Sequence, residues 1–320
     1  MDAPDSKLMA RSDWALLVGL SMLWGGSFLF TEIAIREVPP LTIALVRLGF
    51  GALILHIVLR FLGRRIPGTW NVWGALAVMG LINSMVPISL IAWAQIEIGA
   101  GLASILAATS PLFGMFAAHV LTPDERLSGR RLLGTILGFC GTVVVIGPSA
   151  LGDFGGELIA QLAVLAAAMS SAFGSVFGRR IHSMGVPPLA IATGQVTTAS
   201  ILLLPVVCLL ERPWAHPFPG TDAIMALLAM AVLSTALAYV IFFRVLARAG
   251  AMNILLVGFL VPVSAVLLGN LLLGEDLEFQ DLAGMLLIGI GLVVIDGQLI
   301  RSFRTAHGSY SIRDEDNEPE

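Results

Sequence analysis

Arg47 is the side chain in this sequence whose type and position most directly suggest chemistry. It lies inside the apolar run 41–62, where an ionised group is costly and marks a functional site by default. Two interpretations stay open. The guanidinium binds a solute carboxylate or stabilises a gate around one, or it has a structural role, by snorkelling or by pairing with Glu32. Glu32 lies near the end of the preceding run, as a candidate proton site, as the partner of Arg47, or as a boundary carboxylate.

Uncharged polar and aromatic side chains inside other apolar runs supply further hydrogen-bonding groups. Trp24 offers an aromatic face and one donor, which suits an amphipathic solute. Ser27 shares its run, and Asn83, Ser234 and Tyr239 lie in two later runs. Each of these side chains alone is explained as well by contacts between helices. As a set, they predict a shared cavity that binds a solute.

Glycines and prolines predict where such helices bend. Pro111 and Pro262 each remove one backbone hydrogen bond, so we expect paired kinks that suit a rocking motion, with distortion lacking any function as the alternative. Gly26 and Gly174 permit bending or close backbone approach, so they are candidates for gating or for tight packing.

A series of glycines, Gly134, Gly138 and Gly141, lies on one face of its run. Such a series is typical of close helix packing. A subunit contact in a homodimer is one candidate for what packs there.

The elements that must position these residues are long apolar runs. Of the 320 residues, 57% are hydrophobic and 12% are charged, whereas an ordinary soluble domain is about a quarter charged. A bilayer core about 30 Å thick needs roughly 20 apolar residues per helix. Ten runs fit: 14–35, 41–62, 70–93, 99–121, 130–147, 157–178, 188–210, 221–243, 251–273 and 280–300. They do not alternate as barrel strands do, so we expect an all-α polytopic protein with ten transmembrane helices in a lipid bilayer.

Basic residues set the expected orientation of these helices. Fifteen of the 18 lysines and arginines would lie on one side, with Arg36 and Arg212 on the other and Arg47 within a helix. The positive-inside rule then places both termini in the cytoplasm, with the helices in the plasma or inner membrane. Residues 1–12 become a cytoplasmic N-terminus, and the acidic residues 301–320 become a disordered cytoplasmic tail.

The chain also repeats itself. VPPLTIALVR at 38–47 returns as VPPLAIATGQ at 186–195, 148 residues later. Further pairs follow in the same order at offsets of 148 to 151: Gly26 with Gly174, Asn83-Ser84 with Ser234-Thr235, Pro111 with Pro262, Gly134 with Gly284, and Gly141 with Gly291. Because each half would hold five helices, an odd number, the two halves must be inverted relative to each other, as in many secondary transporters. The expected repeats are 13–147 and 157–300.

The sequence resembles the EamA-like members of the drug/metabolite transporter superfamily. The stretches that carry the resemblance are LWGGSF at 23–28, PPLTIALVR at 39–47, ATSPLFGMF at 108–116, PDERLSGRRLLG at 123–134 and LGEDLEFQDLAG at 273–284. The resemblance implies a carrier, often an exporter of amino acids, metabolites or drugs. It also implies a central cavity between the halves, with the fifth and tenth helices apart from it. The second half departs from the first by having Gln195 in the place of Arg47, which argues against a symmetric charged site.

Other classes of membrane protein lack their machinery in this sequence. An ATP-driven pump needs a phosphate-binding lysine in a glycine-rich loop, and the single lysine, Lys7, precedes the first run. An intramembrane enzyme acting on a lipid-soluble substrate needs a nucleophile–base pair or a metal cluster. No HExxH or GxSxG motif appears, and neither His56 nor His119 has a second ligand at useful spacing. A receptor or scaffold would not need inverted halves. The basic residues lie along the expected cytoplasmic side, which membrane orientation explains, so they do not indicate nucleic-acid binding.

We therefore expect a secondary active transporter, not an enzyme, that moves a small organic solute by alternating access. Export is what the resemblance implies. No cofactor and no metal site are expected, a proton is the candidate coupling ion, and a homodimer stays open. The intramembrane enzyme and the non-transporting receptor or scaffold remain the alternative classes.

Overall fold

Helices form every regular element in the part of the chain that the structure describes, which confirms the expected all-α class for these residues. The structure is a computed structural model that describes residues 11–121, 129–146, 156–254, 257–274 and 278–296. The predicted tail at 301–320, nearly all of the predicted N-terminal segment and parts of the two turns at 123–134 and 273–284 lie outside the described residues.

The elements include three π-helical segments, η1, η4 and η5, and one 3-10 turn, η3. In chain order they are α1 (Arg11–Ala34), α2 (Pro40–Phe61), α3 (Trp70–Gly80), η1 (Leu81–Met85), α4 (Val86–Ala94), α5 (Ala100–Ala107), α6 (Ser110–Leu121), α7 (Gly129–Ile146), α8 (Gly156–Ser183), α9 (Pro188–Leu210), η3 (Pro213–Ala215), α10 (Thr221–Ala229), η4 (Met230–Leu237), α11 (Ala238–Ile254), α12 (Val257–Leu268), η5 (Gly269–Leu273) and α13 (Phe279–Asp296).

Apolar helices long enough for a bilayer make this a multi-pass membrane protein. Six described stretches qualify by length and composition: Ser12–Ala34, Pro40–Phe61, Trp70–Ala94, Gly156–Ser183, Pro188–Leu210 and Thr221–Leu246. Shorter apolar helices are Ala100–Gly114, Leu132–Val144, Leu260–Leu273 and Phe279–Gly291. Each apolar run expected from the sequence overlaps one of these stretches. Large apolar side chains also remain exposed on the outside of the bundle, as lipid contact requires: Leu53, Ile136, Val143, Ile201 and Leu271.

Prolines mark helix starts at several places. Pro40 begins α2 and Pro188 begins α9, because the fixed φ of proline suits the first turn, where its missing N–H is not needed. Pro111 is the second residue of α6, which follows α5 after a break, so the run predicted at 99–121 is two helices. Pro262 lies inside α12. The two prolines that the repeat pairs therefore occupy different helix positions.

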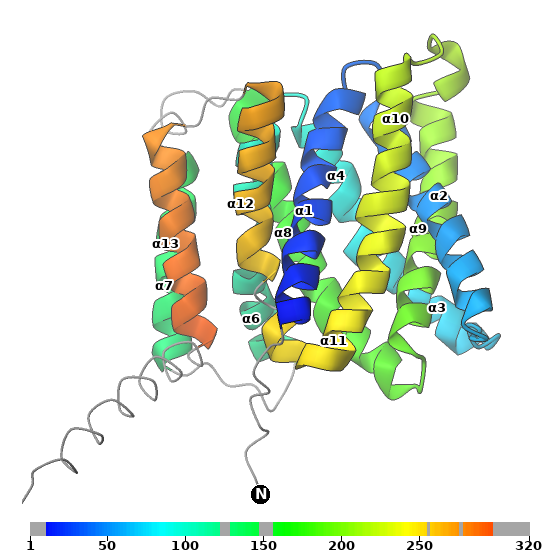
Figure 1. Cartoon of the computed structure of the whole chain (residues 1–320), viewed down its shortest axis with the longest axis horizontal. Helices are drawn as coiled ribbons and strands as arrows, with labels where there is room; N and C mark the ends of the chain where they lie inside the picture. The colour runs from blue at the N-terminus through cyan, green and yellow to red at the C-terminus, as the bar shows by residue number, and fades with distance from the viewer. Residues whose placement is uncertain (1–10, 122–128, 147–155, 255–256, 275–277, 297–320) are drawn as a thin grey trace, which may run out of the picture.

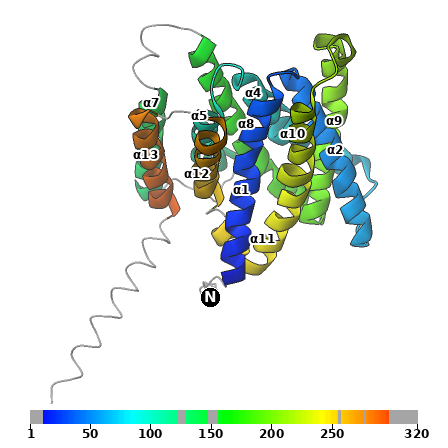
Figure 2. The same ribbon diagram turned by 45° about the horizontal axis from the view of Figure 1, so that its top comes forward.

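Helices from the two halves of the sequence pack against each other. α1 contacts α10, α11 and α12, α2 contacts α9 and η4, and α8 contacts α4, α5 and α6. α7 and α13 form a pair at one side of the molecule in both views (Figures 1 and 2). A buried apolar cluster fills the space between α2 and α9 and includes Ala44, Leu48, Val196 and Leu203.

α2 and α9 run antiparallel. Glu211, the residue after α9, accepts hydrogen bonds from the backbone N–H groups of Leu41 and Thr42 at the start of α2. Farther along α2, His56 Nε2 lies 3.0 Å from Thr197 Oγ1, in the first half of α9. Higher residue numbers on α2 therefore contact lower residue numbers on α9, as in an antiparallel pair.

The glycine series of α7 packs directly on α13. A Cβ on Gly141 would lie 2.8 Å from the Gly284 carbonyl oxygen, and a Cβ on Gly291 would lie 2.6 Å from the Gly134 carbonyl oxygen and 2.7 Å from the Gly138 nitrogen. The partner numbers again run in opposite directions, so these helices are antiparallel. The face that the sequence offered for a subunit contact is thus covered by α13 of the same chain.

The two ends of the bundle are named here by their place in Figure 1. The lower face holds the start of α1 and the end of α13, and it is where α2 and α8 end. The upper face holds the end of α1, the start of α2, the end of α9 and the start of α10.

Candidate functional site

Polar side chains gather where α2 and η4 meet, a contact between the two halves of the sequence. Arg47, on α2, donates a hydrogen bond from Nε to Thr235 Oγ1 of η4 at 3.3 Å. It also interacts electrostatically with Tyr239 of α11. Arg47 and Tyr239 lie deep among protein atoms, yet both side chains keep some accessible surface.

Gln195 extends this group into a network. Its Nε2 donates to the Tyr239 hydroxyl at 3.0 Å, and its Oε1 accepts a hydrogen bond from Asn83 Nδ2 at 3.2 Å. Asn83 lies on η1 and Gln195 on α9, so four separate stretches of chain contribute to one set of contacts. The structure thus brings together Arg47, Asn83 and Tyr239, three of the residues that the sequence singled out.

Gln195 and Thr235 were not among the site residues predicted from the sequence. Both carried a signal there: Gln195 takes the place of Arg47 in the second copy of the repeat, and Thr235 pairs with Ser84. In the structure Arg47 contacts Thr235, and Gln195 contacts Asn83, the neighbour of Ser84. The two contacts therefore occupy corresponding places in the two halves.

The local helix geometry at these contacts is unusual. Asn83 lies in η1 and Thr235 in η4, two π-helical segments that fall at corresponding places in the two halves. A π-helical turn holds an extra residue, which interrupts the regular α-helical hydrogen bonding, and such turns occur frequently at functional sites. The same two positions of the repeat thus interrupt regular helix geometry where the halves exchange polar contacts.

Glycines let the backbones approach closely around the network. A Cβ on Gly51 would lie 2.6 Å from Thr235 Cγ2, and one on Gly80 would lie 2.6 Å from the Gln195 carbonyl oxygen. Gly174 lies directly against Asn83, whose Cβ would be 2.5 Å from an added Cβ. The structure therefore places Gly174 in a tight contact between α8 and η1.

Gly26 has more room than its counterpart in the repeat. The nearest atom that a Cβ there would meet belongs to Phe30, at 3.6 Å, which is an ordinary van der Waals distance. The geometry at this position therefore accepts a side chain.

Aromatic rings connect Trp24 to the network. The Trp24 ring centroid lies 5.6 Å from that of Phe242, which lies 5.1 Å from Phe243, whose ring in turn stacks on Tyr239 at 6.3 Å. These four rings, called the aromatic row below, join α1 to α11. Ser27 is buried on α1 and donates its hydroxyl hydrogen bond to the Trp24 carbonyl oxygen at 2.7 Å, so its described bond is local.

Ser234 precedes Thr235 in the sequence, but its hydroxyl, unlike that of Thr235, forms no described hydrogen bond. Its side chain is 1% exposed, and its Oγ has no hydrogen-bond partner among the described residues. A buried hydroxyl without a partner is costly. Because consecutive residues of a helix point in different directions, the place of Ser234 beside Thr235 in the sequence does not by itself put it in the Arg47 contact.

Glu32 lies in a separate polar contact on α1. Gln95 Nε2, at the end of α4, lies 3.4 Å from Glu32 Oε2 and donates to the Phe28 carbonyl oxygen at 2.9 Å. The described contacts of Arg47 are those with Thr235 and Tyr239.

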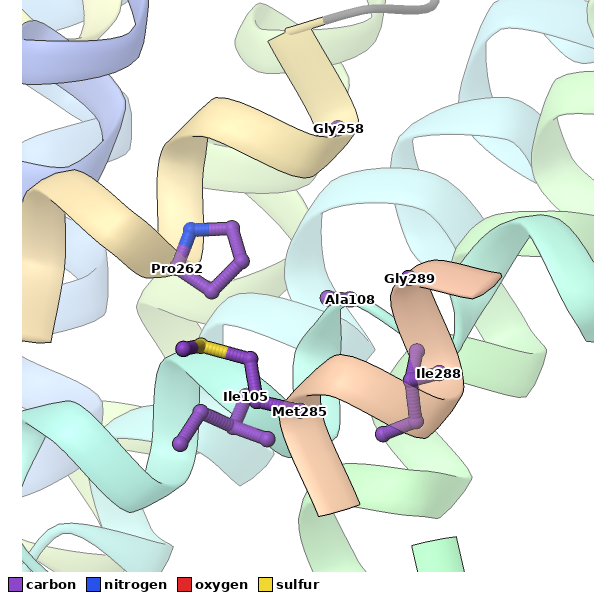
Figure 3. Close-up of a pocket in the computed structure, with 7 residues that line it drawn as sticks. All are labelled: Ile105, Ala108, Gly258, Pro262, Met285, Ile288 and Gly289. Carbon is purple, nitrogen blue, oxygen red and sulfur yellow. The ribbon is translucent and has the colours of Figure 1, made fainter. Parts of the chain in front are cut away.

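A small pocket lies away from the network, between α5, α12 and α13 (Figure 3). It has a volume of about 30 Å³, room for about one water molecule. Its lining comprises Ile105, Ala108, Gly258, Pro262, Met285, Ile288 and Gly289. An apolar pocket of this size does not hold an organic solute. In the described part of the chain, no group of three or more His, Cys, Asp or Glu side chains has the arrangement of a metal site.

Comparisons with known proteins identify the family of this chain. The model of the EamA-like transporter family matches residues 13–147 and again 158–296. A transporter of Bacillus subtilis, YvbV, is 30% identical over 304 residues, covering 91% of this chain and 93% of that protein. A Salmonella typhimurium protein named "Probable amino-acid metabolite efflux pump" is 30% identical over 299 residues, covering 89% of this chain and 95% of its own length.

A solved crystal structure shares the fold. It superposes with a TM-score of 0.63 over 89% of this chain and 97% of the other, at 21% sequence identity. At that identity the likeness concerns the fold alone. The family model, in contrast, matches nearly the whole chain, and this protein therefore belongs to the EamA-like transporter family.

Proposed function

We propose that this protein is a secondary active transporter that moves a small organic solute across the membrane by alternating access. The observation that carries the proposal is the polar network at the contact between the two halves, in which Arg47 reaches Thr235 and Asn83 reaches Gln195. Ionisable and polar side chains inside a membrane-spanning bundle cost free energy, and for that reason they commonly mark a solute or ion pathway. Because Arg47 and Tyr239 keep accessible surface, the solute crevice in this proposal lies along the network.

The proposal includes ten membrane-spanning helices arranged as two inverted repeats, 13–147 and 157–300. The antiparallel pairs α2–α9 and α7–α13, each made of corresponding helices, support it. Other contacts between helices also occur in corresponding pairs, as expected if a two-fold axis relates the two halves. α1 packs on α12, and its counterpart α8 packs on α6; α2 packs on η4, and its counterpart α9 packs on η1. The family model likewise matches the chain twice.

Alternating access follows from this symmetry. Two inverted halves of similar sequence can exchange conformations, so that a site between them opens first to one side and then to the other. In this proposal α7 and α13, one from each half, stay packed on each other at the edge, while the central contacts between the halves change.

The lower face is cytoplasmic in this proposal, and transport is outward. Most described arginines at helix ends belong to the lower face: Arg60, Arg64, Arg65, Arg180 and Arg248. Arg36 and Arg212 follow α1 and α9 at the upper face. This asymmetry supports cytoplasmic termini in the cell membrane by the positive-inside rule. The Salmonella relative is named an efflux pump, which supports export.

Flux in proteoliposomes tests the proposal. Purified protein should accelerate release of one or more small carboxylates from vesicles, and Arg47→Ala should lower that flux by tenfold or more, because a buried charged contact contributes on the order of 2 kcal/mol. The control is Arg60→Ala, an exposed arginine on the same helix, which should leave the flux unchanged. Folded protein that moves no solute in any imposed ion gradient would favour the receptor or the enzyme instead. Flux that survives Arg47→Ala would remove Arg47 from the site.

A further inference from the structure

The charge of the network determines which solutes it suits. Among the described residues, Arg47 contacts only groups that are uncharged at neutral pH, Thr235 and Tyr239. The other members, Gln195 and Asn83, are also uncharged. The network therefore carries one positive charge with no carboxylate in contact with it. Because Arg47 keeps accessible surface, this positive charge is open to an anion that enters the crevice, and a carboxylate there would pair with it.

The lack of a carboxylate among these network residues also disfavours a solute that carries an ammonium group. A zwitterionic amino acid would place its carboxylate on Arg47, and its ammonium group would then face amides and hydroxyls without an opposing charge. Taking that ammonium out of water costs free energy that neutral acceptors do not fully return. A monoanion has no such cost.

The aromatic row indicates which chemical groups suit the part of the solute beyond its carboxylate. Tyr239 belongs both to the polar network and to the row, which continues through Phe243 and Phe242 to Trp24. A solute held by its carboxylate at Arg47 would therefore meet aromatic faces on this side. Aromatic faces favour apolar and aromatic groups.

We infer that the solute is a monoanionic carboxylate with an apolar or aromatic body and no free ammonium group, such as an amino acid whose amine is acylated. This inference rests on the proposed transport function and names the solute class of that same site. It separates solutes of nearly the same size and shape by charge alone.

Three matched probes test the inference in proteoliposomes that hold the purified protein. N-acetyl-phenylalanine is a monoanion, phenylalanine a zwitterion and phenylalanine amide a cation. We expect uptake of the monoanion to exceed that of the other two by about tenfold or more, the order of effect for one unpaired buried charge. Arg47→Gln should abolish the preference, whereas Arg60→Gln should leave it intact. Phe243→Ala should reduce uptake of N-acetyl-phenylalanine more than that of acetate.

The outcomes separate this inference from the proposed function. Uptake of phenylalanine or its amide at a rate equal to the monoanion overturns the solute class and leaves transport standing. Uptake of none of the probes, nor of any solute in a wider panel, overturns transport itself. A charge preference that survives Arg47→Gln assigns the selectivity to another group and overturns the role of the network.

A second and independent observation concerns the upper face. Glu211 accepts hydrogen bonds from Leu41 N at 2.8 Å, from Thr42 N at 2.6 Å and from Thr42 Oγ1 at 2.7 Å. It thereby caps α2 of the other half. Glu37, which follows α1, accepts a hydrogen bond from Gly220 N, just before α10. A carboxylate at a helix N-terminus satisfies free N–H groups and meets the positive end of the helix dipole.

These two contacts, called the upper latches, are not repeated at the two positions of the lower face that correspond to them in the sequence. The repeat places Gly63 where the second half has Glu211, and Gly185 where the first half has Glu37. Both glycines adopt positive φ, 65° and 78°, and neither has a side chain to reach the other half. Among the described residues, the lower face is joined differently, by an ion pair between Asp13 of α1 and Arg248 of α11 at 3.3 Å.

We propose that the upper latches hold the upper face closed, and that solute release there requires both to break. Beneath them lies a buried cluster of α1, α2 and α10 that includes Ile43, which is 1% exposed. A cysteine at position 43 then becomes reactive from the upper side only when the latches open. The proposal rests on alternating access.

Cysteine labelling in intact cells tests the latches. Ile43→Cys is introduced with Cys140→Ser and Cys208→Ser, and a membrane-impermeant thiol reagent is added outside. Adding Glu37→Gln and Glu211→Gln should speed labelling by about tenfold, because weakening two charge-assisted contacts shifts the closed–open equilibrium by that order. Asp222→Asn is the control, since this exposed carboxylate lies at the same face in the first turn of α10.

Labelling that is equally slow with and without Glu37 and Glu211 overturns the latches. Equal acceleration by Asp222→Asn assigns the effect to surface charge and also overturns them. Labelling that occurs only from the cytoplasmic side of inverted vesicles overturns the orientation in the proposed function instead. Thermal unfolding of the purified variants separates an opened bundle from an unfolded one.

Discussion

The α7–α13 pair and the central network follow the same internal repeat and have diverged to different degrees. In the pair, Gly141 meets Gly284 and Gly291 meets Gly134, so corresponding glycines make the same contact twice. In the network, Arg47 meets Thr235 where the other half has Gln195 meeting Asn83. The backbone relation is kept in both regions. The glycines named above are the same in both copies of the pair, whereas the polar contacts of the network use different side chains in the two halves.

This difference teaches what each region must do. Helices that touch through glycine backbones gain van der Waals contact without ordering side chains, and both copies of the contact need the same small residue. A solute has no two-fold symmetry, so a site at the centre needs different groups from each half. Under the proposed function, divergence between the copies marks the binding region, and shared glycines mark the scaffold.

The largest expected effect comes from breaking the scaffold. Gly291→Ala places a Cβ 2.6 Å from the Gly134 carbonyl oxygen, and neither backbone can move without separating the helices. Overpacking of this kind costs about 1–3 kcal/mol. Thermal unfolding in detergent should show the loss, together with lower membrane abundance. Gly289→Ala is the matched control on α13, because a Cβ there meets nothing within 4 Å. Equal unfolding temperatures for the two variants would contradict the close contact.

A smaller effect is expected from the network, and it should appear in transport rather than in stability. Thr235→Val keeps the shape of the side chain and removes the acceptor that Arg47 uses. Loss of a hydrogen bond to a charged group should lower flux by about tenfold with little change in unfolding temperature. Thr31→Val on α1 removes a hydroxyl that bonds only within the described protein interior and should leave flux nearly unchanged. A large stability loss in Thr235→Val would make this contact structural.

The sequence predicted the scaffold more completely than the site, for a physical reason. Apolar run lengths and the glycine series are local signals. Each predicted run overlaps an apolar helical stretch among the described residues, although 99–121 is two helices. The partners of Arg47 depend on how helices of the two halves pack, which no spacing along the chain encodes. Thr235 is one of many hydroxyl residues in apolar runs, and only its contact distinguishes it. Phe242 and Phe243 were equally hidden, because aromatic residues are common in membrane helices.

The residues that correspond in the repeat show what sequence correspondence alone does not predict. Pro111 and Pro262 correspond in sequence, yet one starts a helix after a break and the other lies inside a helix. Gly174 is in tight contact with Asn83, whereas Gly26 has room for a side chain. Correspondence in the repeat predicts a similar backbone path, and the neighbouring helix then decides whether the residue bends, packs or does neither.

An intermediate effect should follow from cutting the bridge between Asn83 and Tyr239. Gln195→Met retains length and volume but removes both hydrogen bonds of the amide. At about 0.5 kcal/mol for each neutral hydrogen bond, the two together contribute about 1 kcal/mol, so flux should fall by roughly fivefold, less than for Thr235→Val. Gln161→Met, a buried glutamine on α8 that bonds Glu157 one turn earlier, is the control for replacing a buried amide. If both variants lose flux equally, Gln195 belongs to the scaffold.

The smallest effect is expected at Gly26, where the two regions make opposite predictions for the same change. If Gly26 behaved like the scaffold glycines, a methyl group would separate helices and lower stability as Gly291→Ala does. The nearest atom, on Phe30, lies at an ordinary contact distance of 3.6 Å, so Gly26→Ala should fit and leave the unfolding temperature unchanged or slightly raised, since alanine favours helix over glycine by about 1 kcal/mol. Flux should change less than twofold if α1 moves as a rigid helix, because the substitution then alters no contact that the seam uses. A large loss of flux with normal stability would instead show that α1 bends at Gly26 during transport, which would place a gate in the first half where its counterpart Gly174 only packs.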